Sequence, residues 1–487
     1  MTTPASEPAN HDTGLAKGSV SAVQVAVVSI AASGPAASVA LTFPQMAGFA
    51  GKAMVFTLIL ALVIIVTLTN TFAEFTKRIP SAGSLVAWNS AGLGSNVGFV
   101  FGWFFVGGYL MIGATGVAAF GGFTSNFLRD SFGVSVPWWV FSAFCAGYVI
   151  VLAWRGVAQT VRSAVILLGI EVGVLLLLAL WLVLSGHTAP DPEPFDPGAS
   201  SGGWPGIGLA IGFGVLAMVG YEEAATLAEE ATDSRRSVSR GLWMAGVGTP
   251  VFFLVVGYVL VASYGPAKEF AADPLAAETL ATRVWGGFGG VVSVVVIVSS
   301  LALAQTSLNA GIRVIYSLGQ VRLLPAVFAR THPRFRTPGA ATVLFSVLVL
   351  PLAFVGSALA GPLTLFGYYG FMTAIAFLVV YALTNVALVR YVRRHDRATF
   401  SWPRHVLVPL VALAGVLYPL YRTVSPLPDA PYPLLTAVVA GWAGLGVALL
   451  VYVRASGKAD VDRVARAFAA VGADTPEQDA REEHPAR

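Results

Sequence analysis

Three acidic residues that could act on a charged solute lie inside or beside long apolar runs. Glu171 is the only ionisable residue between positions 163 and 185, and Glu222 and Glu223 follow a glycine-rich apolar stretch. A carboxylate at membrane depth is costly, so it marks a functional group by default. Neighbouring helical residues point about 100 degrees apart. We therefore expect Glu222 alone to attract a solute's ammonium group or to join helix segments by hydrogen bonds.

Two clusters of small residues interrupt apolar runs. Residues 32–35 read Ala-Ser-Gly-Pro, and Pro35 lacks a backbone N–H and clashes with the preceding turn, which predicts a broken or kinked helix. A second run carries five glycines between positions 206 and 220. In hydrocarbon, such breaks are tolerated only where freed backbone groups meet protein, solute or water. For the glycines from 206 to 214 we favour close helix packing instead, and for Gly220 we favour a site.

The elements that must position these residues are membrane helices. Of the 487 residues 56% are hydrophobic and only 11% are charged, whereas soluble domains carry about 25% charged residues. Repeated apolar runs approach the roughly 20 residues that cross a bilayer. The composition therefore predicts an all-α polytopic protein whose surroundings are the lipid bilayer.

Hydropathy and turn residues predict twelve transmembrane helices. Their ranges are 19–45, 52–76, 96–128, 136–154, 160–185, 205–230, 240–264, 286–317, 340–357, 361–391, 404–423 and 432–454. The two breaks fall in the first and sixth helices, as expected of an inverted repeat with a midplane site. The predicted parts are a tail (1–17), repeat one (18–200), repeat two (201–395), two extra helices (396–455) and a second tail (456–487).

The basic residues predict the orientation. All but five of the 29 Lys and Arg fall on one side of the predicted helices; the exceptions are Lys52, Arg129, Lys268, Arg283 and Arg422. This bias places both termini in the cytoplasm and the protein in the cytoplasmic membrane. Because these residues are scattered singly between helices, we expect no nucleic-acid partner. No cleavable leader pattern precedes the first apolar run.

Three stretches resemble the amino acid, polyamine and organocation (APC) transporter superfamily. GYEEAATLAEEATDSRRSVSRG (220–241) is similar to its Gly-aromatic-Glu helix with an acidic pair and a basic loop. Residues 80–110 resemble its Pro-x-x-Gly loop and Gly-Trp third helix, and residues 308–338 resemble its eighth helix running into a Leu-Pro loop. The resemblance covers about residues 19–455. It implies a LeuT-like inverted 5+5 repeat with two extra helices, and secondary active transport of an amino acid by alternating access.

The resemblance also implies substrate-binding positions. Ala32, Ser33 and Gly34 correspond to the family's Gly-Ser-Gly bend, whose amides hold a substrate carboxylate. Here the first Gly is Ala and Pro35 follows, so a carboxylate would meet fewer N–H groups. Glu222 matches the family's Glu after the sixth-helix break.

Further positions come from the same resemblance. Leu216 corresponds to a bulky gate residue and lacks an aromatic face for cation-π contact, which argues against arginine-like substrates. Ala217 and Gly220 are assigned to the same substrate site, and Tyr109 aligns loosely with a tyrosine near the substrate. Trp103 is expected to pack.

The coupling ion is left open between proton and sodium. Some proton-coupled members carry a Lys on the fifth helix, but residues 168–171 read Leu-Gly-Ile-Glu here. Our hypothesis is that Glu171 takes up and releases the coupling proton; the alternative is a polar contact between helices. Ser299 and Ser300 could instead supply hydroxyl ligands to sodium, or bond their own backbone. No other cofactor or metal is expected.

Two other functions compete with amino acid transport. A permease or exchanger for polyamines or simple amines, such as putrescine or ethanolamine, is favoured by Pro35 and by the adjacent acids. A membrane-embedded enzyme needs clustered catalytic groups, but the six histidines fall in loops, tails or helix ends and no HExxH, GxSxG or P-loop signature occurs.

Five charged residues at cytoplasmic helix ends could close an inner gate or remain solvated. They are Glu74, Glu229, Glu230, Arg235 and Arg236.

Overall fold

The computed structural model describes most of the chain between its two tails. It covers residues 20–455 except Ala82, Gly156, Glu229, Glu230, Pro274, Val321, Arg322, Pro426, Pro428 and Asp429. The predicted tails (1–17 and 456–487) and the candidate gate residues Glu229 and Glu230 therefore lie outside the described residues. The described part is helical, with one isolated parallel bridge between Val20 and Ala231.

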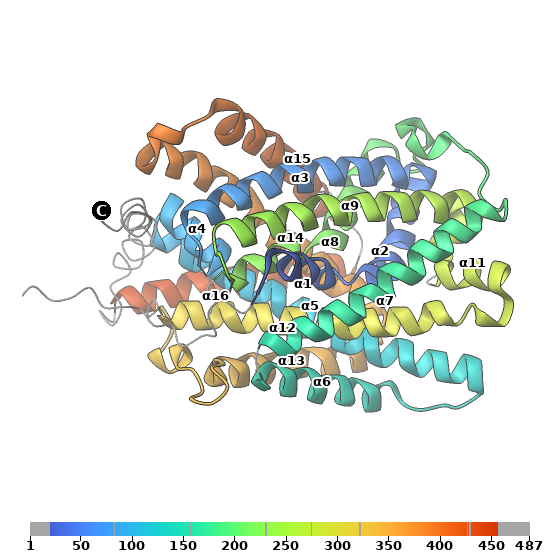
Figure 1. The fold of residues 1–487 in the computed structure, drawn as a ribbon, viewed down its shortest axis with the longest axis horizontal. Helices are drawn as coiled ribbons and strands as arrows, with labels where there is room; N and C mark the ends of the chain where they lie inside the picture. Colours follow the sequence, from blue (N-terminus) through green and yellow to red (C-terminus); the bar gives the residue numbers. More distant parts are fainter. Residues whose placement is uncertain are drawn as a thin grey trace, which may run out of the picture.

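The helices run roughly along the long axis of the molecule, with α1, α8 and α14 near the centre of the view (Figure 1). The α-helices are α1 (Ala22–Ala32), α2 (Pro35–Ala50), α3 (Met54–Arg78), α4 (Ser84–Leu93), α5 (Ser95–Phe132), α6 (Trp138–Arg155), α7 (Val157–Leu184), α8 (Gly203–Met218), α9 (Arg236–Tyr264), α10 (Ala267–Ala272), α11 (Ala276–Trp285), α12 (Val291–Gln320), α13 (Gly339–Ala360), α14 (Thr364–His395), α15 (Val408–Val424) and α16 (Tyr432–Ala455). Short 3-10 turns connect several of them, including η1 (Gly51–Ala53) and η4 (Tyr221–Leu227), and a π turn, η8 (Pro403–Leu407), precedes α15.

The first predicted break is confirmed. Helix α1 ends at Ala32, and Gly34 adopts a left-handed conformation with φ of 53°. Pro35 then occupies the first position of α2, where its missing N–H costs nothing and its fixed φ suits a helix start. The break thus depends on a glycine that permits the turn and a proline that begins the next helix.

The second predicted break is also confirmed, and it lies against the first. Helix α8 ends at Met218, Val219 is extended, and Gly220 has φ of 107° before η4 begins. A Cβ atom on Gly220 would lie 2.8 Å from the carbonyl oxygen of Ala32. Only a glycine allows this approach, so the two breaks are in backbone contact.

The predicted number of twelve transmembrane helices is not confirmed. The described residues contain eleven helical segments long and apolar enough to cross a membrane, and the first of them, Ala22–Arg78, has 57 residues. A single crossing needs about 20 residues. This segment contains α1, α2 and α3, which the sequence assigned to two crossings, so twelve stays a prediction.

Two connections carry helices that hydropathy did not indicate. Helix α4 lies between α3 and α5 and packs on α14, and the short helices α10 and α11 fill the connection between α9 and α12. Helix α4 has little apolar periodicity, and α11, although amphipathic, has only ten residues, about half of what a crossing needs. Their packing against long helices, which the sequence does not display, stabilises them.

Candidate substrate and ion-coupling site

A small cavity lies beside the two breaks. It is lined by α2, α5, α8, α12 and α14, and its volume is about 30 Å³. A space of roughly 10 to 15 Å³ holds one water, so this cavity has no room for an amino acid until its helices separate. Five lining residues carry hydroxyl groups: Ser33, Ser38, Thr42, Thr115 and Thr373. The other six are apolar: Ile112, Leu216, Val219, Leu303, Phe366 and Gly370.

The cavity wall is made by regular helical faces. Ser38 and Thr42 are four residues apart on α2, and Phe366, Gly370 and Thr373 follow the i, i+4, i+7 spacing on α14, which places each set on one side of its helix. Each of these faces therefore presents its members to the same space. Two of the residues predicted from the sequence, Ser33 and Leu216, line the cavity.

Ser38 joins the two breaks directly. Its hydroxyl lies 2.6 Å from the carbonyl oxygen of Ser33 and 3.2 Å from that of Ala217. These carbonyls lie where α1 and α8 end, so they lack a complete set of partners within their own helices. Ser38 was not predicted from the sequence, although it lies four residues before Thr42 on a helix rich in small residues.

The amide groups of the first break already have partners. The backbone nitrogen atoms of Ser33 and Gly34 donate to Ile30 O and Ala31 O, at 3.1 and 3.0 Å. Beyond Pro35, Ala36 N lies 3.4 Å from Glu171 Oε2, and Ala37 N donates to Ser299 Oγ at 3.0 Å. The predicted carboxylate role of this bend stays a prediction, because a carboxylate would have to replace one of these partners.

Glu171 and Ser299 form the link behind the first break. Ser299 Oγ donates to Glu171 Oε2 at 2.6 Å, and both side chains are fully buried. Glu171 Oε1 has no hydrogen-bond partner within the described residues. Ser300 instead donates to Val296 O of its own helix at 2.9 Å. The three ion-coupling candidates therefore separate into a Glu171–Ser299 pair and a serine turned away from it.

The second break carries the other buried acids. Gly220 N donates to Glu222 Oε2 at 3.1 Å, and Glu222 Oε1 and Glu223 Oε1 have no hydrogen-bond partner in the described part of the chain. Both side chains are buried. The hydroxyl of Tyr109 is likewise buried and has no hydrogen-bond partner among the described residues. Glu222 and Tyr109 are not among the residues that line the cavity.

Residues that flank the two broken helices are joined by hydrogen bonds at one end of the bundle. Thr232 N donates to Val20 O at 3.0 Å, beside the bridge between Val20 and Ala231. The guanidinium of Arg313, from α12, donates to Thr226 O of η4 at 3.1 Å. The first contact joins the chain before α1 to the chain after η4, and the second holds η4 against α12.

Glu74 belongs to an ionic network at the same end. Its carboxylate pairs with Lys77 at 2.8 Å, Arg78 at 2.6 Å and His405 at 3.1 Å, and Arg78 also pairs with Asp396 at 2.8 Å. Burial opposes ionisation of Asp396, but hydrogen bonding from Thr399 and the ion pair with Arg78 outweigh it and lower its pKa. Of the other gate candidates, Arg235 and Arg236 each donate a backbone N–H hydrogen bond to the carboxylate of Asp233.

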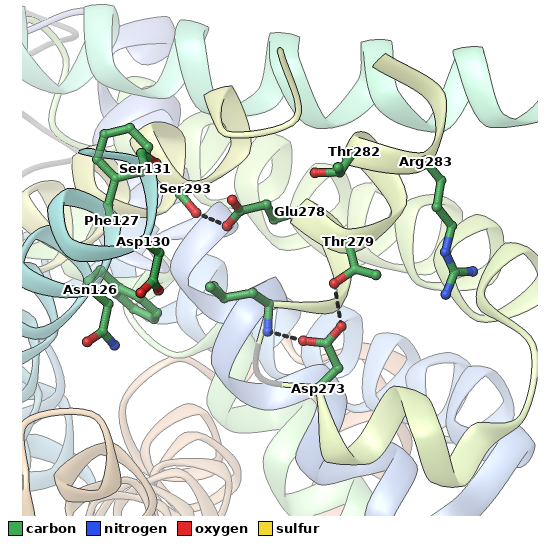
Figure 2. Close-up of a pocket in the computed structure, with 12 residues that line it drawn as sticks. Asn126, Phe127, Asp130, Ser131, Asp273, Glu278, Thr279, Thr282, Arg283 and Ser293 are labelled. Carbon is green, nitrogen blue, oxygen red and sulfur yellow. Dashed lines mark hydrogen bonds between the residues drawn. The ribbon is translucent and has the colours of Figure 1, made fainter. Parts of the chain in front are cut away.

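A larger cavity of about 500 Å³ lies at the opposite end, between α5, α11 and α12. Its carboxylates are held by the protein itself, as Figure 2 shows: Asp273 accepts from Thr279 Oγ1 at 2.6 Å and Leu275 N at 2.9 Å, and Glu278 accepts from Ser293. Tyr264 also donates to Asp273, at 2.7 Å. These bonds anchor the α10–α11 connection to the bundle.

Known proteins resemble the chain over about three quarters of its length or more. Among relatives, the methylthioribose transporter of Bacillus subtilis is 25% identical over 393 residues, covering 76% of this chain and 81% of the relative. The branched-chain amino acid permease BcaP of Lactococcus lactis is 24% identical over 396 residues, covering 76% and 82%. A solved manganese transporter of Eremococcus coleocola has a TM-score of 0.55 at 14% identity and covers 95% of this chain and 97% of its own.

The structural similarity shows the fold alone and confirms the predicted LeuT-like architecture. The family profile described as "Amino acid permease" matches residues 19–445. The predicted APC resemblance and the predicted transport function are thereby confirmed, since the match contains both breaks and the cavity beside them. The chain belongs to the amino acid permease family.

Proposed function

We propose that this permease carries a neutral amino acid with a small apolar side chain, together with a proton. The observation that carries the proposal is the lining of the cavity beside the breaks. Five hydroxyl groups and six apolar residues line it, and none of these residues is charged. A cationic or dicationic solute would lose its hydration there without a counter-charge, whereas a zwitterion can use helix ends.

The helix ends supply the polar contacts for such a zwitterion. The C-terminal ends of α1 and α8 carry partial negative charge, and the N-terminus of α2 carries partial positive charge. The Ser33 and Ala217 carbonyls, both beside the Ser38 hydroxyl, are suited to an ammonium group. The hydroxyl of Thr373, which has no hydrogen-bond partner among the described residues, can donate to the carboxylate once the cavity widens, whereas Thr42 and Thr115 already donate to Ser38 O and Met111 O of their own helices.

Glu171 is the proposed proton carrier. Its Oε2 is tied to the first turn of α2 and to Ser299, so a change in its charge would alter how α2 is held. Ser300 bonds its own helix, so the two serines do not present a joint pair of ligands for sodium. This arrangement supports a proton in preference to sodium.

The uptake test uses purified protein in proteoliposomes. Labelled alanine, valine and leucine should enter saturably without ATP, and faster when an inward proton gradient is imposed. Excess putrescine and methyl esters of the substrate should compete poorly. Uptake driven by a sodium gradient would refute the proposal, and so would the absence of uptake of every amino acid tested. Because one relative is named as a methylthioribose transporter, methylthioribose belongs in the screen.

The proton step is tested with a matched pair of variants. Glu171→Gln can still accept from Ala36 N and Ser299, so it should fold and exchange substrate but lose its response to the proton gradient. Ser300→Ala removes a hydroxyl bonded only within its own helix and should keep that response. Full pH dependence in Glu171→Gln would refute Glu171 as the carrier.

A second candidate function is transport of a simple amine. It is favoured by Glu222 and Glu223, whose Oε1 atoms are buried without hydrogen-bond partners in the described residues. Strong competition by ethanolamine and by substrate esters would select it, since neither has a free carboxylate.

We also propose that both termini are cytoplasmic, which a reporter fused after residue 487 would test. The family and the relatives are transporters, and we propose no enzymatic activity.

A further inference from the structure

A third cavity opens between α14 and α15, away from the substrate pathway. Its volume is about 390 Å³. It lies along the last turns of α14 and the first turns of α15, at the end of the bundle that carries the arginine-rich connections. The positive-inside rule assigns this end to the cytoplasmic face. The proposed transport function does not involve this cavity.

The two halves of the cavity differ in chemistry. Its outer half carries three arginines of one helix, Arg390, Arg393 and Arg394. Its inner half is apolar, with Val386 and Val389 on α14 facing Leu410 and Leu413 on α15. The cavity extends along α14 from Arg394 at its mouth to Asn385 at its floor. These two residues are nine positions apart, which corresponds to about 14 Å along the helix axis.

The three arginines carry uncompensated charge. Among the described residues, no carboxylate lies within ion-pairing distance of Arg390, Arg393 or Arg394, and the nearby Asp396 pairs with Arg78 instead. All three side chains are exposed, and Arg393 stacks over the Phe400 ring at 6.0 Å. An anion with several acceptor oxygens would find up to three guanidinium groups at one place.

We propose that this cavity binds one anionic phospholipid of the cytoplasmic leaflet. The phosphate would lie among the three arginines and an acyl chain would lie in the apolar half. The apolar half extends along α14 from Val389 to Asn385, about 6 Å, so it would hold the part of the acyl chain nearest the headgroup while the rest lies in the surrounding leaflet. Basic pockets between helices at the cytoplasmic interface are suited to such headgroups. A free phosphate would satisfy the arginines and leave the apolar half bare.

Binding of dioleoyl phosphatidylglycerol to the intact purified protein, followed by native mass spectrometry in detergent, tests the proposal. Each arginine near an anionic headgroup contributes roughly fivefold to affinity. Arg390→Gln should therefore weaken the first bound lipid about fivefold, and replacing all three arginines should weaken it about 100-fold. Arg390→Lys, which keeps the charge, should retain most of the affinity.

A second variant and a control separate this site from general surface charge. Leu413→Trp fills the apolar half, keeps all three arginines and should also weaken lipid binding. Arg330→Gln removes an exposed arginine from another connection at the same end and should leave binding unchanged. Equal loss in Arg330→Gln, equal binding of dioleoyl phosphatidylcholine, or complete displacement by inorganic phosphate would each overturn the proposal.

Discussion

The freed amides of the break between α1 and α2 face side chains from distant helices, whereas the freed amide of the break between α8 and η4 donates to a side chain of its own next turn. At the first, Ala36 N and Ala37 N lie against Glu171 and Ser299, which are 135 and 262 residues away in the chain. At the second, Gly220 N donates to Glu222, two residues further on. The same local defect is therefore satisfied in two different ways.

This difference suggests that the two breaks have different roles in transport. The freed amides of the first are occupied, so a change at Glu171 alters the support of a helix that lines the cavity. The second keeps buried carboxylate oxygens that accept no hydrogen bond within the described residues. We therefore connect the first break with coupling and the second with attraction of the solute. The predictions below test that division, from the largest expected effect to the smallest.

Gly220→Ala should be the most damaging substitution. Its φ of 107° is strained for any other residue, and its Cβ would lie 2.8 Å from Ala32 O. The strain and the backbone contact together cost about 2 to 5 kcal/mol, so uptake should fall on the order of 100-fold. Uptake by Gly34→Ala should fall less, because the added Cβ would meet Leu303 Cβ at 3.3 Å and no backbone atom of the other break, although its φ of 53° is also strained.

Gly212→Ala is the control for that comparison. It lies inside α8, where an added Cβ would meet nothing nearer than 3.7 Å. Uptake should remain close to that of the unmodified protein. If Gly220→Ala transported as well as Gly212→Ala, close contact of the two breaks would not be needed for transport.

Ser299→Ala should reduce stability by about 2 kcal/mol, because Ala37 N would be left buried without its acceptor. Ser300→Ala should change stability little, since its hydroxyl bonds only Val296 O on the same helix. Thermal unfolding in detergent measures both. Equal losses in the two variants would show that Ser299 is not a specific support of the first break.

Glu222→Gln should raise the KM for uptake roughly tenfold, because a hydrogen-bonded charge that attracts an ammonium group is worth about 1.5 to 3 kcal/mol. The response to a proton gradient should persist. Glu223→Gln is the matched control, since adjacent residues of a 3-10 turn point about 120 degrees apart. A larger effect on KM in Glu223→Gln would reverse our assignment of the two acids.

Ser38→Ala should have the smallest effect. It removes one hydroxyl that lies against the Ser33 and Ala217 carbonyls, at a cost of about 1 kcal/mol. Uptake should fall a few-fold, with both breaks affected together. Thr42→Val, which changes the next hydroxyl along the same face, should leave the junction of the breaks intact, as initial-rate measurements can show.

Much of the fold could be predicted because membranes impose simple rules. Long apolar runs predicted most of the long helices to within a few residues, as at α7, α13 and α16. The two breaks were predictable because Pro35 and Gly220 belong to clusters of small and helix-weakening residues at membrane depth. The short helices α4, α10 and α11 were not, since they lack the length that makes hydropathy informative.

The candidate site was only partly predictable. Ser33 and Leu216 line the cavity, but Ser38, Thr42, Thr115 and Thr373 do so as well and were missed. Hydroxyl residues are common in membrane helices, and most bond their own backbone, as Ser300 does. Which of them face a shared space depends on how five helices are rotated about their axes.

By itself, the sequence determined that this is a helical membrane protein with two interrupted helices and buried acids beside them. These features follow from local chemistry: apolar length, helix-breaking residues and the cost of a charge in hydrocarbon. Only the tertiary structure decided that Gly220 touches Ala32 and that Glu171 reaches the start of α2. Such contacts join residues more than a hundred positions apart, and they arise from helix packing, which no local pattern records.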